Sequence, residues 1–133
     1  MKKVIIIIVG IVIVGATYGF YLYNKKTPSL VNTSPDFTIS AETLYSEFST
    51  NENEALQIYE GKVIQVEGEI LSISQSDSIS NIVLNADGAL FGGVNCSFKN
   101  LKSSFQKNDN VTVKGRCQGY LNSVVLNNCV IVK

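Results

Sequence analysis

Histidine and tryptophan are absent from the 133 residues of the chain, arginine occurs once, and proline occurs twice. Histidine is the commonest general base and a frequent metal ligand, so its absence argues against most acid–base and zinc chemistry. The three cysteines include no C-x-x-C pair, and no serine lies in a G-x-S-x-G context. We therefore predict a protein that is not an enzyme and has no metal site and no cofactor.

Positive charge is scarce in most of the chain. The formal net charge is zero, but four of the eleven basic residues are the lysines at positions 2, 3, 25 and 26. After Lys26, seven basic residues face eleven acidic ones, which leaves a net charge of about −4. Proteins that bind nucleic acid take much of their affinity from cations that neutralise phosphates. Nucleic acid is therefore disfavoured as a partner.

One long apolar run is present near the N-terminus. It begins at Val4, ends at Tyr23 and contains no charged residue. Twenty helical residues span about 30 Å, which matches the hydrocarbon layer of a bilayer. Aromatic residues gather at the end of the run and lysines follow, as at a bilayer interface. We predict a transmembrane anchor, with the membrane as its partner.

A cleaved secretory signal is the alternative to an anchor. The small pairs available for cleavage, Gly15/Thr17 and Thr17/Gly19, are followed by bulky aromatics that suit an anchor better. The first cysteine is Cys96, far from the run, so a lipoprotein signal is not indicated. Two lysines lie on each side, and the short tail with its free amino group favours a cytoplasmic N-terminus. The domain then faces the periplasm or the extracellular space.

Three segments follow from composition: an anchor over residues 1–23, a linker over 24–38 and one domain over 39–133. The linker contains both prolines among Ser, Thr and Asn, which is typical of an extended, solvated segment. At the start of the domain, Ser40 is placed to cap a helix with Glu42 in its first turn. The apolar stripe that follows is interrupted near Asn51, which predicts one broken helix or two short ones.

After Gly61 the apolar period changes from helical to two, which is typical of β-strands. The pattern predicts three strands, a short helical turn and two further strands. Leu101 and Phe105, four residues apart, indicate the helical turn. The expected ranges are 62–74, 80–86 and 91–98 for the first three strands, 99–106 for the turn, and 110–120 and 123–132 for the closing hairpin. This order matches a mainly β, five-stranded OB-like Greek-key barrel.

The sequence also resembles the tRNA_anti-like OB family over almost everything from Ser40 onward. The motifs that carry the resemblance are SAETLYSEF (40–48), YEGKVIQVEG (59–68), FGGVNCSF (91–98), VKGRC (113–117) and VLNNCVIV (125–132). The resemblance implies a small bacterial OB module that is often attached to a membrane or envelope segment. It implies no particular activity or ligand.

OB folds bind oligonucleotides by stacking bases on aromatic side chains over a basic groove. The second predicted strand contains no aromatic residue, and Phe98 shares its strand parity with core positions. Tyr120 is the one candidate stacking ring, and Lys114 and Arg116 alternate on the outer face of the same strand. An ordinary solvated β face explains these three residues equally well.

The cysteines allow three arrangements. Cys117 and Cys129 lie on the last two predicted strands, and a bulge near Asn127 would place them opposite each other. We favour this disulfide in an oxidising compartment. Cys96 with Cys129 is an alternative, because the third and fifth OB strands are neighbours, and three buried thiols are the other.

Two functional hypotheses from different classes follow. The preferred one is a non-enzymatic binding or interaction module outside the cytoplasm that contacts an envelope protein or polymer. The alternative is a nucleic-acid-binding OB protein whose domain lies in the cytoplasm. Glu67 and Glu69 share one face of the first strand, which suits acid–base work, but alternating outward charge on a half-buried strand predicts the same pair. Gly92-Gly93 precedes a strand rather than a helix, which indicates a bend and not a phosphate loop.

Overall fold

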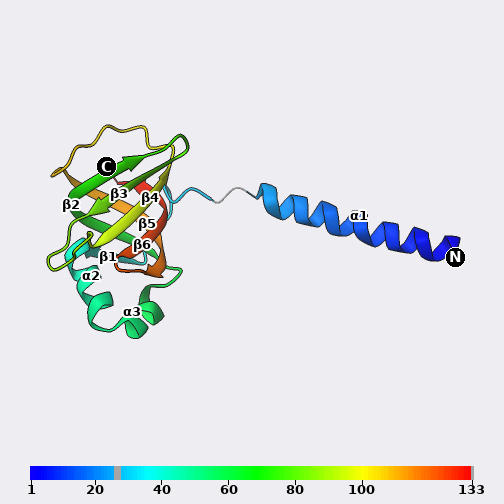
Figure 1. Cartoon of the computed structure of the whole chain (residues 1–133), viewed down its shortest axis with the longest axis horizontal. Coiled ribbons are helices and arrows are strands. Elements are labelled where there is room, and N and C mark those ends of the chain that lie inside the picture. Colours follow the sequence, from blue (N-terminus) through cyan, green and yellow to red (C-terminus); the bar gives the residue numbers. More distant parts are fainter. Residues whose placement is uncertain (26–27, 133) are drawn as a thin grey trace.

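The computed structural model describes residues 1–25 and 28–132. Helix α1 (Lys2–Asn24) is followed by a six-stranded sheet, which closes into a barrel, and by two short helices (Figure 1). Lys26 and Thr27 of the predicted linker lie outside the described residues. The elements after α1 are β1 (Phe37–Ser40), α2 (Ala41–Thr50), α3 (Glu52–Tyr59), β2 (Val63–Gln75), β3 (Ile79–Leu84), β4 (Val94–Lys99), β5 (Asn110–Tyr120) and β6 (Val124–Ile131).

Five of the strands close into a barrel. They are hydrogen-bonded in the order β2-β3-β4-β6-β5, and β5 pairs back with β2. The β4–β6 pair is parallel, and the other four pairings of the ring are antiparallel. This connectivity is that of the OB fold. The prediction of a mainly β, OB-like barrel after an apolar N-terminal helix is confirmed.

Strand β2 belongs to two parts of the barrel. Its first half, from Val63 to Glu69, pairs with β5, and its second half pairs with β3 after a register shift between Ile70 and Ser72. Gly68 lies just before this register shift, and an added Cβ there would lie 2.9 Å from the Ala41 Cβ. A residue without a side chain therefore lets the first turn of α2 pack directly on the strand.

Strand β1 was not predicted from the sequence. Its four residues pair in parallel with β2, with Phe37 opposite Ile64 and Ser40 opposite Glu67. Asp36 fixes the start of this pairing, because its backbone N–H donates to the Val63 carbonyl at 2.7 Å and its carboxylate accepts from the Val63 N–H at 2.9 Å. The barrel thus gains a sixth strand from the end of the predicted linker.

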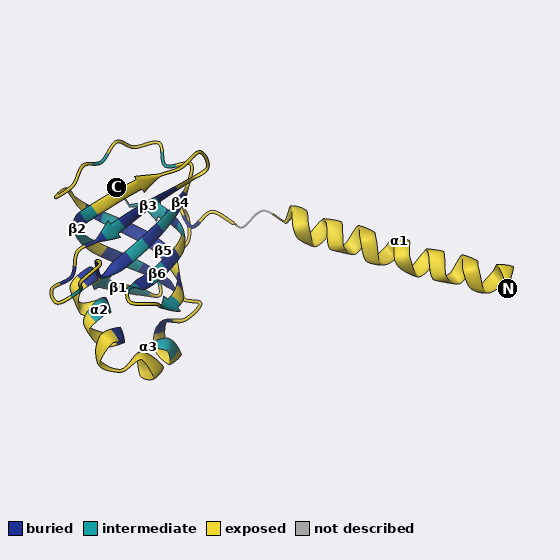
Figure 2. Cartoon of the chain, in the orientation of Figure 1, coloured by how far each residue is buried: buried dark blue, intermediate teal, exposed yellow. Residues whose placement is uncertain are grey.

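Helices α2 and α3 cover one end of the barrel. The Ser40 side chain caps α2 by accepting from the Thr43 N–H, as predicted, and Asn51 ends α2 and caps α3. The break at Asn51 therefore produces two short helices. Leu44 and Phe48 are 0% and 1% exposed, so α2 supplies the barrel core with large apolar side chains. Figure 2 shows buried residues along the strands and exposed residues along α1.

The predicted helical turn over 99–106 is wrong. Residues 100–109 form an irregular loop between β4 and β5. Within it, Asn100 and Asn108 adopt the left-handed region, at φ 58° and 74°. Leu101 and Phe105 still pack on the core. The four-residue spacing therefore reflects two side chains that pack on the core, and the backbone between them is not helical.

The Gly92-Gly93 segment forms the predicted bend, and β4 begins only at Val94. Gly92 has φ 98°, and a Cβ added there would lie 2.2 Å from Cγ1 of Val83. A Cβ at Gly93 would lie 2.2 Å from the Cβ of Ala86. Both glycines are required because the chain passes directly over the end of β3.

The described second half of the predicted linker packs on the barrel. Leu30 is 2% exposed, and the Lys114 ammonium donates to the carbonyls of Val31 and Thr33 at 3.1 and 2.7 Å. The Asn128 side-chain amide donates to the Pro28 carbonyl at 2.8 Å. Residues 28–36, which we call the tether, are thus fixed to β5 and β6.

Candidate ligand-binding groove

The three candidate binding residues serve different purposes in the structure. Lys114 is 8% exposed, because the tether covers it and both Nζ contacts go to tether carbonyls. A buried ammonium needs such acceptors, since an unpaired charge in the interior is costly. Lys114 therefore holds the tether on β5 and does not present its charge to a ligand.

Tyr120 belongs to an aromatic cluster between β5 and α2. Its ring stacks on Phe48, with centroids 5.8 Å apart and an interplanar angle of 13°, and lies 6.2 Å from the ring of Tyr45. Such contacts add to the apolar area that the rings bury. The structure thus uses Tyr120 to attach α2 to the barrel and does not bring it together with Arg116 at one site.

The predicted Cys117–Cys129 disulfide is wrong. Within the described residues all three cysteines are unbonded and buried, and Cys117 pairs with Leu126 across β5–β6. A bulge is present close to its expected place, but it leaves Asn128 and Cys129 together opposite Gly115. Cys129 Sγ fills the space above Gly115, where an added Cβ would lie only 2.5 Å away.

Two of these thiols, Cys117 and Cys96, have raised pKa values. Burial raises the pKa of Cys117 to about 11. A hydrogen bond with Cys129 and complete burial raise the pKa of Cys96 well above its ordinary value. Because the thiolate is the reactive form, protonated thiols at neutral pH behave as small apolar core residues.

Arg116 lines a groove of about 370 Å³ on the outer surface of the barrel. We call this site the basic groove. Its walls come from β3, β4, β5 and β6, so it borders the strand face on which OB folds commonly bind ligands. The lining residues are Ile79, Ser97, Lys99, Arg116, Gln118, Asn127 and Asn128.

Six of the seven residues that line the basic groove are polar or cationic. Lys99 and Arg116 supply the charge, amides and one hydroxyl supply hydrogen-bonding groups, and no lining residue is acidic. The Arg116 Nη1 donates to the Gly61 carbonyl at 2.7 Å, which holds the guanidinium at the groove wall. Phe98 is 2% exposed, so the ring on β4 points into the core as predicted. This lining suits an anionic or highly hydroxylated ligand better than a stacked base.

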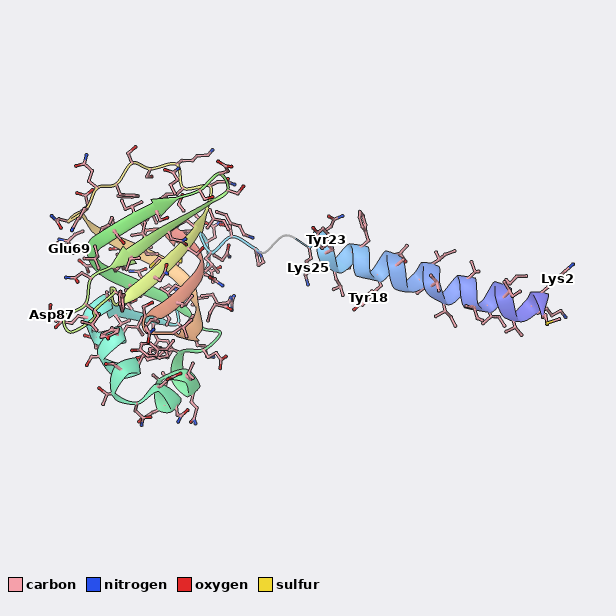
Figure 3. All side chains as sticks on the ribbon, in the orientation of Figure 1. Lys2, Tyr18, Tyr23, Lys25, Glu69 and Asp87 are labelled. Atoms are coloured by element: carbon pink, nitrogen blue, oxygen red, sulfur yellow. The ribbon has the colours of Figure 1, made fainter. Side chains whose placement is uncertain are left out.

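A second hollow, of about 270 Å³, carries the opposite charge. We call it the acidic hollow. Glu42 of α2, Glu67 and Glu69 of β2, and Asp87 of the β3–β4 loop line it. Figure 3 labels Glu69 and Asp87, which lie on the same side of the barrel. Glu67 and Glu69 therefore form part of an open acidic surface, as alternating outward charge on a strand predicts.

A third cavity, of about 400 Å³, lies between α2 and α3. There the Tyr59 hydroxyl donates to the Glu47 carboxylate at 2.6 Å. Burial and this hydrogen bond raise the pKa of Tyr59 to about 12. The contact joins the two helices, because Glu47 lies on α2 and Tyr59 on α3. In the described residues no group of three or more acidic, thiol or imidazole side chains is arranged to hold a metal ion.

The barrel closure, the parallel β4–β6 pair and the groove on the strand face define an OB-fold protein with a candidate ligand site. The chain belongs to the tRNA_anti-like family, whose model matches residues 1–131. The resemblance seen in the sequence motifs is thereby confirmed.

The barrel is also similar to solved structures. A "putative nucleic acid-binding lipoprotein" from Klebsiella pneumoniae aligns with a TM-score of 0.58 and 19% identity, over 72% of this chain and 91% of that one. Yeast Stn1 and Ten1 align with a TM-score of 0.45 and 10% identity, over 79% of this chain and 66% of that one. No curated protein matches the sequence. The first likeness supports the OB-like fold.

Sequence reasoning found only one residue of the basic groove, Arg116. It missed Lys99, which follows Phe98 in β4, and the amides of Gln118, Asn127 and Asn128. Strand parity was a usable signal for Lys99, Gln118 and Asn127, because each lies one residue from a core position and so points outward. The neighbourhood of β4, β6 and β5 that brings them together follows only from the barrel topology.

Proposed function

We propose that this protein is a non-enzymatic binding module that α1 holds at a membrane, and that the basic groove is its ligand site. The observation that carries the proposal is the gathering of Lys99 and Arg116, without a carboxylate, in one groove of an otherwise acidic domain. Amides, a hydroxyl and two cations recognise a partner through hydrogen bonds and charge.

The properties of α1 support anchoring. Its 23 residues include an 18-residue stretch with a mean hydropathy of 2.4, so the helix is long and apolar enough to cross a bilayer as an anchor or a signal sequence. None of its residues is buried in the structure. Figure 3 shows Tyr18, Tyr23 and Lys25 towards one end of the helix and Lys2 at the other. Interfacial tyrosines and flanking lysines are typical of helices that remain in the membrane.

The proposed orientation has the N-terminus in the cytoplasm and the barrel in the periplasm or the extracellular space. The short basic tail supports it through the positive-inside rule. Protease treatment of intact spheroplasts carrying a C-terminal tag tests it, with a cytoplasmic protein as control. Loss of the tag is expected, whereas protection until lysis contradicts the orientation.

A second candidate is nucleic-acid binding. The similar Klebsiella pneumoniae structure is named for that property, and Lys99 and Arg116 border the face that OB folds use for it. The net charge of the domain and the lack of an aromatic ring among the groove-lining residues weigh against it. The electrophoretic mobility of a single-stranded oligonucleotide of about 20 nucleotides at low salt distinguishes the two candidate functions. Only nucleic-acid binding predicts that the protein shifts its mobility.

Photocrosslinking of the full chain in cells tests the proposal directly. A photoreactive amino acid replaces Asn127 in the basic groove or, as a matched control, Glu67 in the acidic hollow. We expect an adduct from position 127 that is reduced by Lys99→Gln with Arg116→Gln, and none from position 67. The chemistry of the adduct, read by protease, nuclease and mass shift, identifies the ligand class.

Equal adducts from both positions, or none from position 127, contradict the basic groove as the ligand site. A nuclease-sensitive adduct at position 127 favours the second candidate. An adduct that persists unchanged in the Lys99→Gln, Arg116→Gln variant shows that charge in the groove does not select the ligand.

A further inference from the structure

The basic groove and the membrane helix are joined by a short stretch of chain. Helix α1 ends at Asn24, and Pro28 already contacts the groove, since its carbonyl accepts from the Asn128 amide at 2.8 Å. Four residue steps separate Asn24 from Pro28, which span at most about 14 Å. Asn128 itself lines the groove. The groove therefore lies within reach of the end of α1 however the connecting residues are arranged.

The tether restricts how far the barrel can turn away. Leu30 is 2% exposed, and Lys114 holds the carbonyls of Val31 and Thr33. Detaching the tether would expose the apolar Leu30 side chain and break both hydrogen bonds of the Lys114 ammonium, and each loss costs free energy. The tether contacts therefore hold Pro28, four residue steps from the end of α1, against the barrel.

The charge near this path is positive. Lys25 follows α1, and Lys99 and Arg116 line the basic groove. The acidic residues that give the domain its net negative charge include the cluster of the acidic hollow, on other elements. Anionic lipid headgroups attract basic side chains within a Debye length of the bilayer, by roughly fivefold in affinity per cation.

We infer that the basic groove binds the phosphate of anionic lipid headgroups in the same membrane that holds α1. In this arrangement Lys99 and Arg116 contact the phosphate oxygens, and the groove amides contact the polar headgroup. The inference rests on the proposed function, because it takes the basic groove as the ligand site and names the ligand class. It is independent of which side of the membrane the barrel occupies.

Tryptophan quenching in nanodiscs tests the inference, because the chain contains no tryptophan of its own. The full chain carries Ile79→Trp at the groove or, as control, Leu121→Trp at the β5–β6 turn. These positions are 47% and 79% exposed, so the ring is tolerated at both. Leu121 precedes the start of β6, whereas Asn128 lies towards its end. The discs contain headgroup-labelled quencher lipid in either phosphatidylcholine or a phosphatidylcholine–phosphatidylglycerol mixture.

We expect the groove tryptophan to be quenched about twofold or more strongly in the anionic discs than in the neutral ones. Lys99→Gln with Arg116→Gln should remove that difference, and the Leu121→Trp control should show none. Inorganic phosphate added to the anionic discs should lower the quenching only at concentrations that match or exceed the local headgroup phosphate. Competition at micromolar phosphate would instead make free phosphate the ligand and overturn the inference.

Equal quenching in both lipids, or an anionic dependence at Leu121→Trp as well, also overturns the inference. Failure of the parent proposal is distinguishable from this outcome. The quenching of the groove tryptophan could be the same in both lipids while the photoreactive residue at position 127 forms an adduct with a protein or polymer. In that case the basic groove remains the ligand site and only the assignment of the lipid headgroup fails.

Discussion

The basic groove and the acidic hollow are two depressions on the surface of the same small barrel, and they differ mainly in charge. The groove holds Lys99 and Arg116 with no carboxylate, and the hollow holds four carboxylates with no cation. A net charge of about −4 after Lys26 describes neither site. The ligand class of a small domain therefore has to be argued from the local charge at each site, since screening limits the reach of the rest.

The largest expected effect comes from removing the charge of the groove. Lys99→Gln with Arg116→Gln should lower the yield of the Asn127 adduct at least about tenfold, because each cation contributes roughly fivefold near an anionic partner. Quantitative mass spectrometry of the adduct measures this loss.

The matched variant is Glu67→Gln with Glu69→Gln in the acidic hollow, which changes the net charge by the same amount with opposite sign. It should leave the adduct yield unchanged. A rise in yield with this variant would mean that overall charge, and not the basic groove, governs binding.

The next largest effect distinguishes Lys114 from Lys99. Lys114→Met should lower the free energy of unfolding by about 1–3 kcal/mol, because the carbonyls of Val31 and Thr33 lose their donor. Lys99→Met, on the exposed end of β4, should change it by less than about 0.5 kcal/mol. Urea denaturation of the full chain in detergent measures both. Equal losses would show that the tether contact is not structural.

A smaller effect is the dependence of ligand binding in the basic groove on salt concentration. Raising the ionic strength from about 0.05 M to about 0.2 M shortens the Debye length roughly twofold and should reduce the Asn127 adduct a few-fold. The hydrogen bond between Tyr59 of α3 and Glu47 of α2 is partly buried, so the same change in salt should leave it intact. A salt-independent adduct would point to recognition by hydrogen bonds alone.

The last effect concerns the core thiols and is confined to high pH. Burial raises the pKa of Cys117 to about 11 from its ordinary value of 9.0, so the folded protein holds this proton more tightly than the unfolded chain. The resulting stabilisation is fully present below pH 9 and is lost as the pH rises through about 11. The free energy of unfolding of the Cys117→Ala variant should therefore fall less steeply than that of the wild type between pH 9 and 11. Parallel curves for the two proteins would contradict this pKa.

Most of the barrel was predictable because strand alternation is local. Period-two alternation predicted β2, β3, β4, β5 and β6 in order, and five strands in this order matched the OB fold even though the helical turn expected between β4 and β5 is a loop. Strand β1 was not predictable in this way, since alternation over only four residues does not identify a strand and its partner β2 begins more than twenty residues later. The turn over 99–106 failed because two apolar residues four apart also fit a loop that closes over a core.

The candidate site was less predictable because it depends on contacts between distant segments. Alternation correctly placed Lys114 on the outer side of β5, but only the fold shows that the tether covers it. The disulfide prediction failed for a related reason. The bulge that pairs two residues with Gly115 shifts Cys129 past Cys117, and a shift of this kind cannot be counted from spacing alone.

The most direct test of the basic groove as a membrane-held ligand site is the amine reactivity of Lys99 relative to Lys107. Both lysines are exposed, and Lys107 lies in the loop between β4 and β5. Acylation rates by mass spectrometry are compared between the full chain in its membranes and the same chain in detergent. We predict that Lys99 reacts several-fold more slowly in membranes while Lys107 is unchanged, because only Lys99 contacts a ligand. An unchanged Lys99 to Lys107 ratio would contradict the central claim.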